Sequence, residues 1–191
     1  MSETMPRFAY PIIPDCAWTT FIANCSTIVN PIKFQLSVDN VAIDLQLRPA
    51  VTETLPVVAC FSPLFFNERW QLAAISIESY AAAGISRQIY YLMSAVKDVY
   101  DLLKLYEKEK LIDINLWSLP KHSEARIHLD WRNQAAAHTD CYLQYREAAQ
   151  FIIISDIDDL LFPRKEFSFI NELTIFFIII SKCFVLFLST I

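Results

Sequence analysis

The stretch Phe151-Ile152-Ile153-Ile154-Ser155-Asp156-Ile157-Asp158-Asp159 decides the fold of this chain. Four consecutive apolar residues lead almost directly into an acidic cluster. A short continuous apolar run is typical of a strand that is buried on both faces of a parallel sheet. Ligands of such sheets bind beyond the carboxyl ends of the strands. We therefore expect a ligand site that includes these carboxylates.

Similar strand patterns precede this stretch and alternate with helical patterns. The expected strands are residues 57–61, 87–93 and 111–117, and the expected helices are residues 67–83, 96–108 and 131–149. Asn67 is the expected cap of the first helix, and Gly84, the only glycine, is expected to end it in a left-handed conformation. The order strand-helix-strand predicts an α/β fold with a mainly parallel sheet and helices on both faces.

The two ends of the chain differ from this middle part. Residues 1–55 are rich in proline and include alternating apolar and polar residues at 34–38 and 41–47 around Asp39-Asn40, which predicts a hairpin in a small β-rich lead-in. The start lacks the pattern of a signal peptide or anchor. Residues 56–172 form the expected main domain.

Residues 173–191 are mostly apolar and about long enough to cross a membrane as a helix. Lys182 near the middle of this segment opposes insertion by about 3 kcal/mol. We expect a single membrane span, with a truncated or alternatively spliced end as the other interpretation, because the amphipathic pattern stops abruptly after residue 172.

Composition narrows the range of ligands. The formal net charge is −5 and no long basic run occurs, so nucleic acid is not an expected partner. One glycine cannot supply either of the glycine-rich phosphate-binding loops. A phosphorylated ligand would therefore need another means of being held, such as a metal ion.

The five cysteines contain no CxxC pair, which argues against a zinc ribbon or a thioredoxin-type site. The favoured interpretation is that they are small, buried apolar side chains. A disulfide formed in the secretory pathway is the alternative, with Cys16 and Cys25 the nearest pair in sequence and the connectivity left open.

Asp156 and Asp158 are two residues apart, so on extended backbone their side chains would point the same way and could bind one cation. Such hard oxygen ligands suit Mg²⁺ or Mn²⁺. The alternative is that Asp156 caps a loop while Asp158 and Asp159 face solvent. A phosphatase with an aspartate nucleophile is disfavoured, because few residues follow the motif.

Several runs in the same order resemble glycosyltransferase family 92. They are CFSPLFFNERW at 60–70 with the helix, glycine and strand that follow, YEKEKL at 106–111, WSLP at 117–120, QAAAHTDC at 134–141 and SDIDDLLFPR at 155–164. The resemblance covers about residues 56–172. It implies a GT-A fold, transfer of a hexose such as galactose from a UDP-sugar to a glycan acceptor with inversion, Mn²⁺ as cofactor, and a Golgi or secretory-pathway membrane setting.

The resemblance also implies roles for individual residues. Asp156 and Asp158 match the motif that binds the metal and the diphosphate, and Asp159 stands where the family more often has Glu. Four further positions are candidate donor contacts. These are Ser62 and Pro63, which follow the first strand of the sheet, and Arg132 and Asp140 of the last helix before the acidic cluster.

Two features of the family pattern have no counterpart in this chain. We find no N-terminal signal anchor, and no second half that would carry the acceptor site and the catalytic base. The base therefore stays unknown, and His122, His128 and His138 are interpreted as surface or packing residues. The alternative function is that of an inactive, membrane-associated fragment that binds UDP and metal weakly or not at all.

Overall fold

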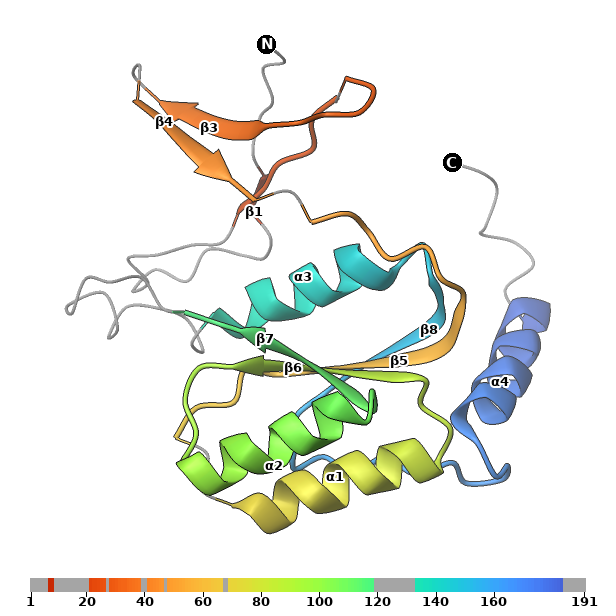
Figure 1. The fold of residues 1–191 in the computed structure, drawn as a ribbon. Coiled ribbons are helices and arrows are strands. Elements are labelled where there is room, and N and C mark those ends of the chain that lie inside the picture. The colour runs from red at the N-terminus through yellow and green to blue at the C-terminus, as the bar shows by residue number, and fades with distance from the viewer. Residues whose placement is uncertain are drawn as a thin grey trace.

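A four-stranded parallel sheet forms the centre of the protein. The computed structural model describes residues 7–8, 21–26, 28–38, 41–46, 48–66, 69–118 and 133–183. Strands β5 (Leu55–Phe61), β6 (Arg87–Leu92), β7 (Ile112–Leu116) and β8 (Ala149–Ser155) lie in the order β7-β6-β5-β8, with every neighbouring pair parallel. The α/β fold with a mainly parallel sheet is confirmed (Figure 1).

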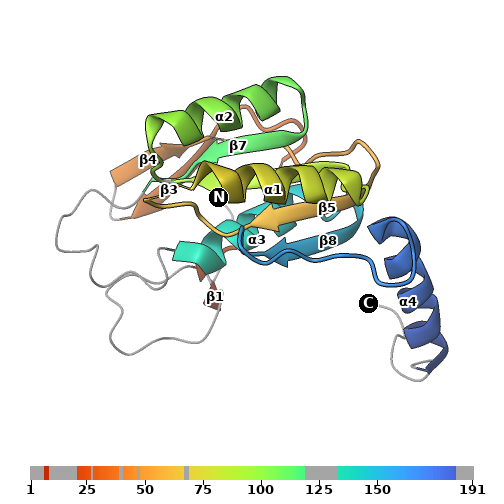
Figure 2. The ribbon, with the colours of Figure 1, turned by 90° about the horizontal axis from the view of Figure 1, so that it is seen from below.

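Helices cover both faces of this sheet. Helices α1 (Trp70–Ala82) and α2 (Lys97–Lys108) lie on one face and α3 (Gln134–Tyr145) lies on the other (Figures 1 and 2). Alternate residues of β5 point to opposite sides, so Val57, Ala59 and Phe61 join the core under α1 and α2, while Val58 and Cys60 join the core under α3. Burial on both faces explains why β5 is an almost continuous apolar run.

The order of the strands creates a switch point between β5 and β8. The chain leaves β5 through α1 toward one side of the sheet and reaches β8 through α3 on the other side. The carboxyl ends of β5 and β8 therefore border the crevice in which open α/β sheets bind their ligands.

Gly84 ends α1 as the sequence predicts. Its φ of 83° lies in the left-handed region, its N–H donates to the carbonyl of Ala81 at 3.0 Å, and the N–H of Ile85 donates to that of Tyr80 at 3.0 Å. These two bonds satisfy carbonyls that the helix would otherwise leave open. At the other end the helix begins at Trp70 with Arg69 at the cap position, and Asn67 lies outside the described residues.

The helix expected at 131–149 is too long at its C-terminal end. Helix α3 ends at Tyr145, because the Ala148 N–H donates to the Tyr145 carbonyl at 2.9 Å in a turn that follows the helix. Ala149 is instead the first residue of β8 and lies opposite Leu55. Trp131 lies outside the described part of the chain.

Short antiparallel pairs precede the main sheet. Strands β1 (Arg7–Phe8) and β2 (Phe21–Ile22) form one pair. Strands β3 (Phe34–Val38) and β4 (Val41–Leu45) form the expected hairpin, with Phe34 opposite Leu45. Residues 39 and 40, where the turn is expected, lie outside the described residues. The β-rich N-terminal segment is confirmed.

Helix α4 (Phe169–Cys183) contains most of the apolar segment near the C-terminus. It is anchored where the Phe169 ring stacks on Tyr80 with centroids 6.0 Å apart and where Ile170 and Leu173 pack against the core. Within the described ranges, no helix combines the length and the apolar character that a membrane crossing needs. Residues 184–191 are not among them, so the span expected over 173–191 stays a prediction.

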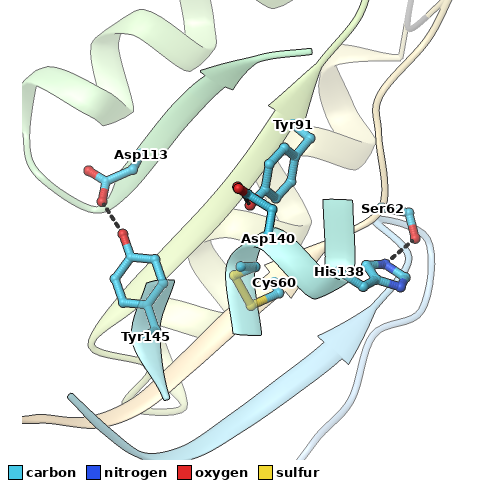
Figure 3. Close-up of a disulfide and its surroundings, with 8 residues drawn as sticks. Cys60, Ser62, Tyr91, Asp113, His138, Asp140 and Tyr145 are labelled. Atoms are coloured by element: carbon cyan, nitrogen blue, oxygen red, sulfur yellow. Dashed lines mark hydrogen bonds between the residues drawn. A yellow bond between two sulfur atoms is a disulfide. The ribbon is translucent and has the colours of Figure 1, made fainter. Parts of the chain in front are cut away.

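A disulfide between Cys60 and Cys141 joins β5 to α3 (Figure 3). The favoured interpretation of these two cysteines as unlinked apolar side chains is therefore wrong, although both are fully buried. The sequence could not identify the pair, because 81 positions separate the two residues and only the fold brings their Cα atoms to 6.1 Å. Cys16, part of the pair nearest in sequence, lies outside the described residues.

Candidate functional site

Ser62 and Asp156 lie side by side at the switch point of the sheet. Each is the first residue after its strand, β5 for Ser62 and β8 for Asp156. The Ser62 N–H donates to the carbonyl of Ser155 at 3.1 Å, so the ladder between the two strands continues to the point where these residues leave it. The sequence-predicted donor residue and the first residue of the acidic cluster therefore meet.

The hydroxyl of Ser62 is the centre of a polar network. It donates to Oδ1 of Asp156, while Nε2 of Gln134 donates to the Ser62 oxygen at 2.8 Å and to Oδ1 of Asp156 at 3.4 Å. Nε2 of His138 lies 3.0 Å from the same hydroxyl oxygen (Figure 3). Gln134 and His138 are four residues apart on α3, so both side chains face the crevice from one side of the helix.

These contacts define the tautomer of His138. A serine hydroxyl has one proton and two lone pairs. The proton of Ser62 is directed to Asp156, so the Ser62 oxygen can only accept from Gln134 and His138. The Nε2 atom of His138 must therefore carry a hydrogen.

Burial lowers the pKa of His138 below its ordinary value of 6.5, and the charge of Asp156 opposes this shift only in part. At neutral pH the ring is therefore neutral, with its proton on Nε2. The network then carries one negative charge, on Asp156, and a cation beside that carboxylate would not be repelled by an imidazolium.

A serine next to a histidine also suggests nucleophilic catalysis, but the geometry here opposes it. In a nucleophilic triad the histidine accepts the serine proton and a carboxylate orients the histidine. Here the carboxylate of Asp156 bonds to the serine itself. Among the described residues, no carboxylate is hydrogen-bonded to His138. The network is built to orient Asp156, not to activate Ser62.

The acidic cluster forms a turn instead of continuing the strand. The Asp159 N–H donates to the carbonyl of Asp156 at 3.1 Å, which closes a tight turn after β8. The argument that Asp156 and Asp158 point the same way on extended backbone is therefore wrong, because side chains alternate regularly only in a strand. Asp156, Asp158 and Asp159 are all exposed.

The turn is anchored from inside the protein. The buried Tyr80 donates its hydroxyl hydrogen to the carbonyl of Asp159 at 2.8 Å, and the Ser155 hydroxyl lies 3.2 Å from the same oxygen. Tyr80 also accepts from the Leu161 N–H at 3.4 Å. The backbone that carries the acidic side chains is thus fixed to the core, while the carboxylates themselves remain accessible.

The donor set of this turn suits a hard divalent cation. Exposed carboxylates supply the oxygen ligands that Mg²⁺ and Mn²⁺ prefer, and two of them leave positions for phosphate oxygens. Within the described ranges, no group of three or more potential protein ligands is close enough together to enclose a metal ion. The exposed carboxylates of Asp156 and Asp158 have the chemistry that such a cation requires.

The other sequence-predicted contacts have different surroundings. Pro63 is buried next to Ser62. Asp140 accepts from the hydroxyl of Tyr91 at 2.6 Å (Figure 3). It also pairs with Arg48, so its carboxylate ties α3 to β6 and to the lead-in segment. Burial raises the pKa of Tyr91, which keeps its hydroxyl a hydrogen-bond donor. Arg132 lies outside the described residues.

Gln134 and His138 are site residues that the sequence did not reveal as such. Their spacing of four places them on one face of a helix. Both contact Ser62, which precedes Gln134 by 72 positions and His138 by 76 positions. Only knowledge of which strand end α3 covers could have identified them. The sequence indicated packing or surface roles for His138, and the structure adds its 3.0 Å contact with the Ser62 hydroxyl.

The fold and the candidate site define an α/β protein with exposed carboxylates at the switch point of a parallel sheet. The sequence profile described as glycosyltransferase family 92 matches residues 55–175. This chain belongs to glycosyltransferase family 92.

Curated relatives from Caenorhabditis elegans support this assignment. The chain is 36% identical to Glycosyltransferase family 92 protein F59C6.8 over 169 residues, and this match covers 83% of this chain and 32% of the relative. It is 32% identical over 168 residues to Glycosyltransferase family 92 protein ZK381.2, and this match covers 84% of this chain and 33% of the relative. The chain thus spans about a third of the length of these relatives. No solved structure gives a significant match.

Proposed function

We propose that this chain forms the donor-binding half of a glycosyltransferase, with the nucleotide-sugar diphosphate bound at the switch point between β5 and β8. The observation that carries the proposal is the network in which Ser62 and Gln134 orient the exposed Asp156 at the carboxyl ends of these strands. Membership of the family supplies the class of reaction.

Asp156 and Asp158 are the residues that would hold a divalent cation, with Mn²⁺ the proposed ion. Such an ion neutralises charge on a leaving diphosphate. The chain carries a net charge of −5 and, within its described part, no Lys or Arg is hydrogen-bonded into the network around Asp156. A cation held by these carboxylates would offset the charge of a bound diphosphate.

Ser62 and Pro63 are proposed to face the nucleoside, because they begin the loop that follows β5 at the edge of the crevice. Asp140 is a less suitable donor contact, since both of its carboxylate oxygens already have partners. We propose a UDP-hexose such as UDP-galactose as donor, a glycan as acceptor, and inversion at the anomeric carbon, which follow from the family resemblance alone.

A second candidate function is a binding fragment without transfer activity. Inversion requires a base that deprotonates the acceptor hydroxyl. In the described part of the site, the titratable groups hydrogen-bonded to Ser62 are Asp156, which accepts the serine proton, and His138, whose Nε2 hydrogen is already committed to the serine oxygen. This favours donor binding over complete catalysis within these 191 residues.

We further propose that the protein acts in an oxidising compartment of the secretory pathway, at a Golgi membrane. The buried Cys60–Cys141 disulfide supports this, because disulfides persist in such compartments and are rare in the cytosol. The membrane attachment rests on the apolar segment 173–191.

The test is calorimetric titration of UDP into the full chain, with Mn²⁺ and with a chelator. We expect saturable binding only with Mn²⁺, and loss of that binding in Asp156→Ala and in Asp158→Ala. Glu109→Gln is the matched control, because Glu109 is an exposed carboxylate that follows α2 at the amino ends of the strands. Binding that is independent of Mn²⁺, or equal in all variants, would refute the proposal.

A further inference from the structure

The position of Asp156 depends on a hydroxyl that is itself held by two side chains. Ser62 donates to Oδ1 of Asp156 and accepts from Gln134 and from His138. The one hydrogen and both lone pairs of the hydroxyl group are thus engaged in hydrogen bonds. A serine hydroxyl that lacked one of these partners could rotate and direct its proton elsewhere.

Both contacts to the carboxylate end on the same oxygen. Ser62 and Gln134 donate to Oδ1 of Asp156, while Oδ2 has no hydrogen-bond partner among the described residues. Asp156 as a whole is exposed. The network therefore holds Asp156 through one oxygen of its exposed carboxylate.

The elements that carry the network are joined covalently just below it. Cys60 lies two residues before Ser62 on β5, and Cys141 lies three residues after His138 on α3. The disulfide holds the strand and the helix at a constant separation at this level (Figure 3). A rigid supporting shell of this kind is what keeps a binding group in its productive direction.

We propose that His138 is a positioning residue, which acts through the Ser62 hydroxyl to direct Asp156 toward the cation and the donor diphosphate. This inference deepens the proposed function and rests on it. Within the described residues, the hydrogen bond of His138 goes to Ser62 and not to the acidic turn. Its contribution must therefore disappear when Ser62 is absent.

The first experiment measures the hydrogen on His138 without any ligand. Long-range proton–nitrogen NMR spectra of the full chain at neutral pH should show the neutral ring with its hydrogen on Nε2. In Ser62→Ala this preference should weaken, because the oxygen that accepts the Nε2 hydrogen is gone. A ring with its hydrogen on Nδ1, or a spectrum that Ser62→Ala leaves unchanged, would overturn the proposed chain of contacts.

The second experiment measures Mn²⁺-dependent UDP binding in five variants of the full chain, of which one is the Ser62→Ala/His138→Ala double variant. His138→Ala should weaken binding about two- to tenfold, the effect of one lost hydrogen bond. His138→Gln should restore most of it, because an amide N–H can replace the Nε2 hydrogen. Leu143→Ala is the control, since Leu143 is exposed on the same helix. The Ser62→Ala/His138→Ala double variant should bind UDP with the same affinity as Ser62→Ala alone.

The results separate this inference from the proposed function. If the unaltered chain binds UDP with Mn²⁺ and Asp156→Ala abolishes binding, but His138→Ala binds normally, the inference is wrong and the proposed function stands. If His138→Ala weakens binding equally with and without Ser62, the histidine does not act through that hydroxyl. If the unaltered chain shows no Mn²⁺-dependent binding, both ideas fail.

Discussion

Removing the Cys60–Cys141 disulfide should destabilise this protein strongly. The bond closes a loop between residues that are 81 positions apart. The chain-entropy treatment of a loop of that length gives about 4.5 kcal/mol of stabilisation at 25 °C. Residual structure in the unfolded chain reduces this value, so we expect a loss of about 3–4 kcal/mol in the Cys60→Ala/Cys141→Ala double variant. A domain whose total stability is about 5–15 kcal/mol would then be close to its limit.

The assay is urea unfolding followed by far-ultraviolet circular dichroism. With a denaturant slope of about 2 kcal/mol per molar urea, the midpoint should fall by about 1.5–2 M. Unaltered protein treated with a reductant should shift in the same direction, whereas Cys25→Ala, which leaves this bond intact, should not. Peptide mapping that finds Cys60 and Cys141 unlinked, or a midpoint that reduction leaves within about 0.3 M, would refute the reasoning.

Three further predictions concern single side chains around the site. Tyr80→Phe should lower stability by about 1–3 kcal/mol in thermal unfolding, because it keeps the buried ring but leaves the Asp159 carbonyl without its 2.8 Å donor; an unchanged midpoint would show that this bond is unimportant. Burial lowers the pKa of His138 in the folded chain, so the unfolded chain binds more protons just below pH 6.5 and the free energy of unfolding should decrease as pH falls there. His138→Gln should flatten that part of the stability–pH curve, and an unaltered slope would contradict the assignment. Phe66 is 82% exposed with a φ of 47°, so Phe66→Asn should raise stability by about 0.5–1 kcal/mol in urea unfolding, and a loss would mean that the ring is needed.

The sequence predicted those parts of the fold that depend on local pattern. Apolar runs identified β5 and β8. Strand β5 is buried on both faces, which explains its run. The expectation that β8 is buried on both faces is wrong, because β8 lies at the edge of the sheet and most of its residues are only partly buried. Gly84 marked the end of α1, because the left-handed conformation that it adopts is costly for other residues. The acidic cluster was expected at the ligand-binding edge of the sheet, and Asp156 lies beside Ser62 at that edge.

The sequence could not predict what depends on contacts between distant residues. The role of His138 follows from its 3.0 Å contact with Ser62, across 76 positions of the chain. The direction of Asp158 depends on the turn that the Asp159 N–H closes, and a carboxylate pair alone does not specify whether a strand continues or turns. The Cys60–Cys141 disulfide could likewise not be identified from the sequence, because its recognition requires the knowledge that α3 covers β5.

Paramagnetic broadening by Mn²⁺ in amide NMR spectra tests the central claim most directly. Sub-stoichiometric Mn²⁺ is added to the ¹⁵N-labelled full chain in the presence of UDP, and the loss of each amide signal is recorded. We expect losses centred on the amides of Ser62 and Leu64 and of residues 134–138 and 155–160, and we expect no such losses in Asp156→Ala. Losses centred on other carboxylates, such as Glu107 and Glu109 at the far end of α2, or uniform losses over the chain, would contradict a cation site at the switch point.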